Sequence, residues 1–309
     1  MPLVSVIMNV QNGAAFLGEA LDCVMAQTFT DWELIAWDDC STDESAKIIA
    51  GYQDSRVRYF LSPESTPLGK ARDKAIRQAR GEWLAFLDQD DLWTSTKLQK
   101  QMELADAQVG IIYGRAVLFY PDGHKRDYDQ AHEFTLLPEG NIFSELFSNA
   151  CFIAMSSAVL RRSAVEEIGS IPDFVEITPD YYLYVAIAHR YPARAVQEVV
   201  CWYRMHSSNM WRESRRKVHQ EALAMIDQWA GCLDPRVAGY RRMTHATSLA
   251  LEEMGSRVSI SSGIKRLFTE GSVTWLMSRP FVHIFRRMAR RVHRPLWQKN
   301  APQMSGDRP

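Results

Sequence analysis

The sequence is poor in cysteine, and the few that it has are far apart. Five cysteines are spread over 309 residues without a C-x-x-C pair. An odd number of widely separated cysteines is typical of reduced thiols, and it argues against a disulfide framework or a zinc site. These residues are Cys23, Cys40, Cys151, Cys201 and Cys232.

The sequence also lacks long apolar runs and an excess of charge. No stretch approaches the roughly 20 apolar residues that span a bilayer, and the opening MPLVSVIMNV has no basic region before its short apolar run. We therefore expect a cytoplasmic protein that can still touch a membrane surface. The formal net charge of −1 argues against a nucleic-acid-binding protein that works by bulk charge.

Short apolar runs alternate with amphipathic segments over the first 120 residues. The apolar runs predict strands, and apolar residues at helical spacing between them predict helices. This alternation indicates a parallel, doubly wound α/β sheet. The expected strands are Val4–Val10, Trp32–Trp37, Val57–Leu61, Trp83–Leu87 and Val109–Tyr120, and the expected helices include Ala14–Gln27, Leu68–Arg80 and Thr94–Ala107.

The alternation is less regular after Pro121. Residues 122–138 are polar and predict a mobile loop. Strands are expected at Ser157–Leu160 and Ala195–Arg204, and the chain from Trp211 onward reads mainly as helices. Further helices are expected at Asn141–Phe147, Ser163–Ile168 and Asp180–Arg190.

Two acidic clusters follow predicted strands directly. Asp38-Asp39 closes one strand, and Asp88-Gln89-Asp90-Asp91 closes another. Ligands of doubly wound sheets bind beyond the carboxyl ends of the strands, so we expect the two clusters to meet in one crevice.

Three carboxylates within Asp88–Asp91 repel one another unless a cation or strong donors compensate. Oxygen ligands favour a hard cation such as Mg²⁺ or Mn²⁺, which keeps positions open for phosphate oxygens. Such a cation would neutralise charge on a leaving diphosphate. The alternative is a solvated turn that caps the helix expected from Thr94.

The Asp39 carboxylate is expected to accept hydrogen bonds from a base N–H or from the ribose hydroxyls of a bound nucleotide. The alternative is that it caps the following helix, for which Ser41 and Thr42 are better placed. The helix that opens at Leu68 should point its N-terminus into the same crevice, where its amides and Arg72 can meet a phosphate. We expect Lys70 to be solvated.

Five segments of the chain occur in one order and at ordinary spacing between residues 3 and 211. They are Val4–Gly13, Gln27–Leu34, Asp38–Asp43, Ala71–Ile76 and Gly81–Trp93. Together they resemble the inverting glycosyltransferases of family 2, which have a GT-A type fold. The resemblance implies a Rossmann-like, mostly parallel sheet flanked by helices, and transfer of a sugar from a nucleotide-diphosphate donor.

The resemblance also implies roles for single residues of the donor site. Val10 and Asn12 would flank the nucleotide base, and Asp39 would contact a uracil-like ring. Arg72 would belong to the donor site as well, and Asp88 would hold ribose or metal-bound water.

A Mn²⁺ or Mg²⁺ ion would be ligated by Asp90, with Asp88 beside it. Tyr203–Met210 resembles the family's Tyr-Arg-x-His segment, so His206 would ligate the metal or bind the diphosphate. Arg204 would pair with an aspartate of the crevice or with phosphate. Asp91 would support the site from behind or cap a helix.

The family's general base is commonly the aspartate of a Glu-Asp pair that opens a helix. The matching stretch here has Asp180, but Pro179 replaces the glutamate. Proline suits the first turn of a helix, so Asp180 is expected at a helix N-terminus, aimed at the acceptor hydroxyl. The alternative is that Asp180 is only a helix cap. The apolar segment Asn149–Ser157 would lie beside the acceptor.

The resemblance divides the chain into residues 1–120, a nucleotide-sugar-binding half, residues 121–212, an acceptor-binding half, and a helical C-terminal extension over 213–309. The expected partners are a nucleotide sugar, with UDP favoured, and a saccharide or lipid-linked acceptor of cell-surface polysaccharide synthesis. Two alternatives are a non-catalytic nucleotide-sugar-binding scaffold and an aspartate-dependent phosphotransferase.

Residues near 279–297 predict a basic amphipathic helix. Seven cations and no acidic residue lie between Gly271 and Gly306, and Phe281, Ile284 and Phe285 begin an apolar face. This pattern is typical of a helix that lies on an anionic membrane surface. The alternative is a helix packed on the catalytic domain. We expect a peripheral position on the inner face of the cytoplasmic membrane.

Overall fold

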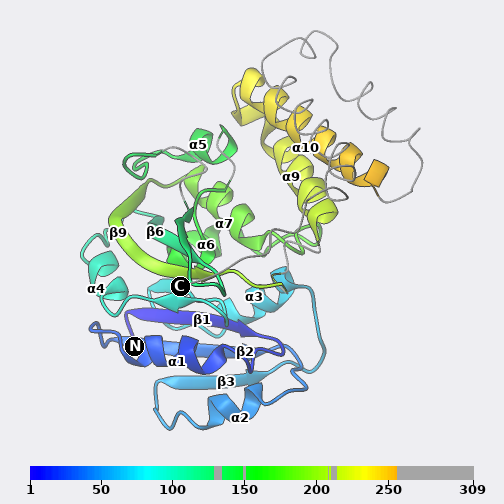
Figure 1. Ribbon diagram of the computed structural model, residues 1–309. Coiled ribbons are helices and arrows are strands. Elements are labelled where there is room, and N and C mark those ends of the chain that lie inside the picture. The colour runs from blue at the N-terminus through cyan, green and yellow to red at the C-terminus, as the bar shows by residue number, and fades with distance from the viewer. Residues whose placement is uncertain (129–133, 149–150, 208, 210–213, 256–309) are drawn as a thin grey trace, which may run out of the picture. The chain divides into compact units, whose positions relative to one another are not determined.

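The computed structural model describes residues 1–128, 134–148, 151–207, 209 and 214–255. Residues 1–241 form one unit, and the described residues that follow, 242–255, belong to a second. In the described part of the first unit, a nine-stranded sheet lies between helices, which confirms the expected α/β class (Figure 1).

The first four long strands of the sheet are parallel. Strand β1 (Val4–Val10) pairs with β2 (Trp32–Asp38) on one side and with β4 (Trp83–Phe86) on the other, and β3 (Val57–Leu61) pairs with β2. The carboxyl ends of β1, β2 and β4 therefore meet at one edge of the sheet, where the acidic clusters follow.

Alternate residues of β1 serve two separate cores. Val6 and Met8 pack with helix α1 (Leu17–Met25) on one face, whereas Ile7 packs with helix α3 (Leu68–Ile76) on the other. Because side chains alternate along a strand, a sheet with helices on both faces needs apolar residues at nearly every position. This explains the continuous apolar run at the start of the chain.

The second half of the sheet is mixed. Strand β8 (Val159–Arg161) is antiparallel to both of its neighbours, β4 and β6 (Ile111–Phe119), while β9 (Ala193–Arg204) runs parallel to β6. The short strand β5 (Leu92–Trp93) pairs antiparallel with β9. The order across the sheet is β3-β2-β1-β4-β8-β6-β9-β5, with β7 beside β6.

The sheet is mostly parallel in its first half, as the family resemblance implied, and β5, β7 and β8 run antiparallel to their partners. One prediction from the residue pattern is corrected here. The polar segment 122–138 is not only a loop, because β7 (Lys125–Asp127) forms a hairpin with β6. All residues of β7 are exposed, and an exposed strand needs no apolar residues, so the sequence of β7 has no apolar run that would predict a strand.

The helices are mostly shorter than their amphipathic patterns predicted. The described helices that have not yet been introduced are α2 (Ser45–Ala50), α4 (Lys97–Met102), α5 (Phe143–Ser148), α6 (Arg162–Ile168), α7 (Pro179–Ala188), α9 (Arg215–Trp229) and α10 (Pro235–Gly255), with short 3₁₀ turns at η2 (Met155–Ser157) and η3 (Ala230–Cys232).

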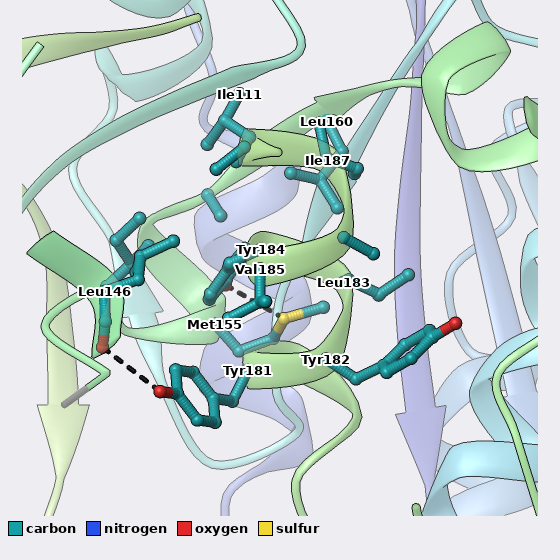
Figure 2. Packing of buried hydrophobic residues seen from close by; sticks show 14 of the residues in the cluster. Ile111, Leu146, Met155, Leu160, Tyr181, Tyr182, Leu183, Tyr184, Val185 and Ile187 are labelled. Carbon is teal, nitrogen blue, oxygen red and sulfur yellow. Dashed lines mark hydrogen bonds between the residues drawn. The ribbon is translucent and has the colours of Figure 1, made fainter. Parts of the chain in front are cut away.

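Helix α7 is a core helix. Every residue in it is buried except Asp180, and a helix that is apolar on all sides belongs in an interior. Figure 2 shows its side chains packed against neighbouring elements, with the Tyr181 hydroxyl donating to the Leu146 carbonyl at 3.1 Å. The packing leaves Asp180 as the one partly exposed side chain of the helix.

No helix among the described residues is long and apolar enough to cross a membrane. The basic amphipathic helix predicted near 279–297 lies outside the described residues.

Candidate functional site

Asp39 lies just beyond β2 and is held by several donors. Its Oδ2 accepts hydrogen bonds from the Ser65 hydroxyl and the Thr66 backbone amide, both at 2.9 Å, and from the Gln11 side-chain Nε2 at 3.3 Å. Its Oδ1 has one long contact, 3.4 Å to the Thr66 hydroxyl. Asp39 is only 4% exposed. It does not cap α2, because the cap position of that helix is Glu44, and Oδ1 keeps capacity for a further donor.

Two residues next to the strand ends adopt left-handed backbone conformations. Asn12 has φ 49° and Cys40 has φ 61°, a region that costs non-glycine residues energy and is found often at functional sites. The Asn12 side chain accepts from the Thr42 amide at 2.8 Å, and the Asp39 amide donates to the Val10 carbonyl at 2.7 Å. The ends of β1 and β2 are therefore tied together.

Gln11 and Gln89 join the two acidic clusters. The Gln89 side chain accepts from the Gln11 amide at 2.9 Å and donates to the Gln11 carbonyl at 3.1 Å. Because Gln11 also contacts Asp39, a continuous chain of hydrogen bonds runs from Asp39 to the Asp88–Asp91 turn. The predicted meeting of the clusters at one edge of the sheet is thus observed.

Arg72 projects from the first turns of α3 and binds Asp88. Its Nη2 donates to Asp88 Oδ1 at 2.8 Å, and the residue is 3% exposed. Its Nε is buried without a hydrogen-bond partner, which leaves a donor for another group at the site. Lys70, by contrast, is half-exposed and pairs with Asp173 at the surface, as expected for a solvated residue.

Asp91 is buried behind the turn. Its Oδ2 accepts from the Ser156 hydroxyl at 2.6 Å and its Oδ1 from the Arg204 amide at 2.9 Å. The Ser156 hydroxyl also accepts from the Asp88 amide at 3.0 Å. Asp91 therefore anchors the turn to η2 and β9, and the alternative that it caps the next helix is wrong.

Asp90 and His206 are in direct contact. His206 Nε2 lies 2.7 Å from Asp90 Oδ2, and the two side chains are 15% and 21% exposed, respectively. The His206 amide donates to the Asn209 side chain at 2.7 Å, and the imidazole ring lies 5.2 Å from the ring of Phe16. The structure thus brings the two residues from distant parts of the chain to one place.

Arg204 supports the Asp90 turn through the backbone. Its Nε donates to the Asp90 carbonyl at 2.7 Å, and its Nη2 pairs with Glu19 at 2.9 Å. The guanidinium lies 4.6 Å from the ring centres of both Phe16 and Phe119. Arg204 therefore meets the expected aspartate of the crevice through the Asp90 carbonyl, while the carboxylate that pairs with its guanidinium is Glu19 on α1.

Asp180 is the second residue of α7, after Pro179. Burial raises the pKa of its carboxyl, and the positive charge of Arg72 opposes that rise. Thr178 occupies the cap position, and the backbone amides of Asp180 and Tyr181 also lower the pKa of the Asp180 carboxyl, so Asp180 contacts the first turn of its own helix.

Two neighbouring carboxylates, those of Asp90 and Asp180, act on Asp88. Burial raises the pKa of Asp88 to about 6, Arg72 opposes this, and the charges of Asp90 and Asp180 add to it. Burial also raises the pKa of Asp91 well above its usual range. The aspartate of α7 and those of the β4 turn therefore share one electrostatic environment, although they come from different halves of the chain.

The structure contains contributors that the sequence did not indicate. Gln11 and Gln89 lie inside the segments that resemble the family, but they are uncharged and so did not stand out as ligands. Ser156 lies in an apolar stretch. Glu19 is one acidic residue among others on an amphipathic helix. Only their positions close to strand ends could have suggested Gln11 and Gln89.

The arrangement has excess negative charge suited to a cation. Among the described residues, no three His, Cys, Asp or Glu side chains have the geometry of a formed metal site. Asp90 and Asp180 nevertheless raise the pKa of Asp88, and a divalent cation bound by oxygen ligands would relieve that repulsion. Oxygen ligands of this kind would favour a hard cation such as Mn²⁺ or Mg²⁺.

Comparison with known proteins agrees with this geometry. The chain is 28% identical over 223 residues to the putative teichuronic acid biosynthesis glycosyltransferase TuaG of Bacillus subtilis, covering 70% of this chain and 85% of that protein. It is 30% identical to UDP-Glc:alpha-D-GlcNAc-diphosphoundecaprenol beta-1,3-glucosyltransferase WfaP of Escherichia coli, covering 70% and 84%.

Solved structures share the fold at low sequence identity. S. aureus TarS 1-349 in complex with UDP-GlcNAc has a TM-score of 0.62 at 15% identity, covering 86% of this chain and 79% of that one. The mannosyltransferase PcManGT of Pyrobaculum calidifontis, in complex with GDP-Man and Mn²⁺, has a TM-score of 0.59 at 18% identity, covering 97% and 88%. These similarities confirm the GT-A type fold.

The family model described as Glycosyl transferase family 2 matches residues 5–169, which is more than half of the chain. This match includes the ends of β1, β2 and β4 and the Asp88–Asp91 turn. The chain therefore belongs to glycosyltransferase family 2.

Proposed function

We propose that the protein transfers a sugar, with inversion, from a UDP-sugar to a hydroxyl of a saccharide or lipid-linked saccharide in cell-surface polysaccharide synthesis. The observation that carries this proposal is the hydrogen-bonded edge of the sheet that joins Asp39, Arg72 and the Asp88–Asp91 turn. The charge of Asp180 also raises the pKa of Asp88 there, and transfer needs a base beside the activated donor. The names of TuaG and WfaP support the substrate class, since both refer to bacterial envelope saccharides or their lipid-linked precursors.

Residues 1–120 would bind the donor. Asp39 Oδ1 has acceptor capacity for a base N–H, and Val10 and Asn12 lie at the strand ends beside it. Arg72 has a buried Nε without a partner, which suits an oxygen atom of the nucleotide sugar. The UDP and UDP-GlcNAc complexes of TarS support UDP as the nucleotide.

Asp90 and Asp88 would hold Mn²⁺ or Mg²⁺, with His206 in contact with Asp90. When bound, the cation would neutralise the charge that develops on the leaving diphosphate. The Mn²⁺ complex of PcManGT supports this choice of cation. Arg204 and Ser156 hold the turn that carries these carboxylates.

Asp180 would act as the general base from the acceptor-binding half, residues 121–212. Its carboxylate would take the proton of the acceptor hydroxyl while that oxygen attacks the anomeric carbon and the bond to the diphosphate breaks. A raised pKa makes the carboxylate a stronger base than an exposed aspartate. Nucleoside diphosphate and the glycosylated acceptor are the products.

A screen of nucleotide sugars tests the proposal. UDP-, dTDP- and GDP-sugars are incubated with Mn²⁺ and a GlcNAc-diphosphate-lipid acceptor, and nucleotide release is measured for the wild type and Asp90→Ala. We expect Mn²⁺-dependent release with a UDP-sugar, lost in Asp90→Ala and retained in Asp173→Ala, whose side chain is 88% exposed. A wild type that binds nucleotide sugars but never releases nucleotide would support a scaffold instead.

A lipid-linked acceptor would place the enzyme on the inner face of the cytoplasmic membrane, through the basic helix predicted near 279–297. Flotation with anionic vesicles, comparing the full chain with one that ends before Ser278, tests this part. Equal flotation of the two chains would contradict it.

A further inference from the structure

Helix α9 contributes a buried carboxylate to the segment that precedes α7. Glu221 is 3% exposed and accepts from three consecutive backbone amides. The Glu176 and Ile177 amides donate to Oε1 at 2.9 and 3.0 Å, and the Thr178 amide donates to Oε2 at 2.9 Å. The Thr178 hydroxyl adds a bond of 2.7 Å to Oε2.

These bonds define where α7 begins. Thr178 is the cap residue and has no side-chain bond to the amides of the helix, and Pro179, which follows it, has no N–H to donate. The amides of residues 176–178 have no helical partner of their own and would be costly to bury unpaired. Glu221 satisfies them together and so fixes the start of the helix that carries Asp180.

Residues 175–176 are in close contact with Gly69 at the start of α3. The Gly69 amide donates to the Glu176 carbonyl at 3.4 Å. A Cβ atom at Gly69 would lie 2.3 Å from the Val175 carbonyl oxygen, so only glycine permits this approach. Because α3 carries Arg72, the segment 175–178 sets the start of α7 and that of α3 relative to each other.

A second contact joins α9 to this segment. Lys217, one turn before Glu221, forms an ion pair with Glu176. The charge of Glu221 also acts on Asp180, whose pKa it raises. Burying a carboxylate is expensive unless several donors compensate, and here all four donors belong to residues 176–178, immediately before Pro179 and Asp180.

We infer that Glu221 is a positioning residue for glycosyl transfer: from α9, it holds residues 176–178 so that Asp180 faces Arg72 and Asp88. The inference depends on the proposed role of Asp180 as the base. In this inference α9, which lies after the segment matched by the family model, contributes to catalysis by positioning Asp180.

Two variants test the inference. Glu221→Gln keeps the volume and one acceptor oxygen but replaces Oε2, the partner of Thr178, with a donor group. Thr178→Val removes only the hydroxyl bond. Gln220→Glu, the reverse change at an exposed position of the same helix, is the matched control.

Transfer rate, donor affinity and local hydrogen exchange are measured for each protein. We expect Glu221→Gln to lower kcat about 10- to 100-fold, because small displacements of a base have effects of that size. The dissociation constant for UDP with Mn²⁺ should stay within about 2-fold, because the donor residues lie on other elements. Amide exchange in residues 176–181 should rise roughly 10-fold, with Thr178→Val intermediate and the control unchanged.

Two results would overturn the inference. Exchange in residues 176–181 that equals the wild type would show that Glu221 does not hold the segment, whether or not transfer is detected. A parallel loss of donor affinity and kcat would show a general loss of structure instead of positioning. Absence of transfer in the wild type would refute the proposed function, and faster exchange in Glu221→Gln would still show that Glu221 holds the segment.

Discussion

Replacing Asp88 with asparagine should stabilise the free protein, although the residue lies at the centre of the proposed donor site. Its pKa is raised from 3.8 to about 6, first by burial and then by the charges of Asp90 and Asp180. The ionised carboxylate is therefore disfavoured in the folded state. Asparagine keeps an oxygen that can accept from Arg72, but it carries no charge.

The size of the effect follows from this pKa. The difference of about 2 pKa units corresponds to about 3 kcal/mol. Because 34% of the Asp88 side chain is exposed, solvent screening reduces the gain to about 1–2 kcal/mol. For a unit of this size, that gain raises the melting temperature by about 3–6 °C.

The sign of the pH dependence is definite. Well below pH 3.8, Asp88 is protonated in both states and no penalty exists. As pH rises from 3.8 through the folded-state value near 6, the penalty develops in the wild type and not in Asp88→Asn, and above pH 6 it is fully present. Melting temperatures at pH 4.5 and pH 7.5 measure this, and we expect the difference between the two proteins to be much larger at pH 7.5.

Asp173→Asn serves as the control, because its carboxylate is exposed and its ion pair with Lys70 lies at the surface. An Asp88→Asn protein no more stable than the wild type at pH 7.5 would refute the reasoning that the cluster is under charge repulsion. Added UDP and Mn²⁺ should stabilise the wild type and have little effect on Asp88→Asn.

Three further changes have definite expected outcomes. Asp180→Asn should lower transfer about 100- to 10,000-fold while UDP binding persists, as nucleotide release and calorimetry would show, because a base is lost and donor contacts remain; near-normal turnover would exclude it as the base. Lys97→Met should raise the melting temperature at pH 6, because burial lowers the pKa of Lys97 to about 7 and the charged lysine destabilises the folded state. This stabilisation should disappear towards pH 10, where the folded protein no longer has to bury the charge. A difference in melting temperature that does not depend on pH would contradict this. Gly69→Ala should cost about 1–3 kcal/mol in a urea titration, because its Cβ meets the Val175 carbonyl at 2.3 Å; unchanged stability would show that the contact relaxes freely.

The strands were the most accurate predictions from the sequence. Val4–Val10 and Val57–Leu61 have the predicted bounds, and Trp32–Asp38 differs by one residue. Their apolar runs end in turn residues, and both signals are local. The helix predicted over Thr94–Ala107 is shorter in the structure, Lys97–Met102. The spacing of apolar residues indicates which face of a helix is buried, but it does not show at which residue the backbone hydrogen bonds of the helix end.

The direction of β8 was beyond local prediction. Its residues are as apolar as those of a parallel strand, and a buried strand has the same pattern in either orientation. Only the path of the chain from β6 through α5 and η2 sets the direction, and that path depends on packing between distant segments. The resemblance implied a mostly parallel sheet, but which strands run antiparallel appeared only in the structure.

The sequence by itself determined the family, the α/β class and the aspartates at the strand ends, because short motifs and apolar runs are local properties of the chain. The tertiary structure alone decided which groups support those aspartates: Gln11 and Gln89 between the clusters, Ser156 behind the turn, Glu19 against Arg204 and Glu221 before α7. Each of these contacts joins residues far apart in sequence. A hydrogen bond depends on distance and angle in space, and residues with no pattern in the sequence acquire such partners only when the chain folds.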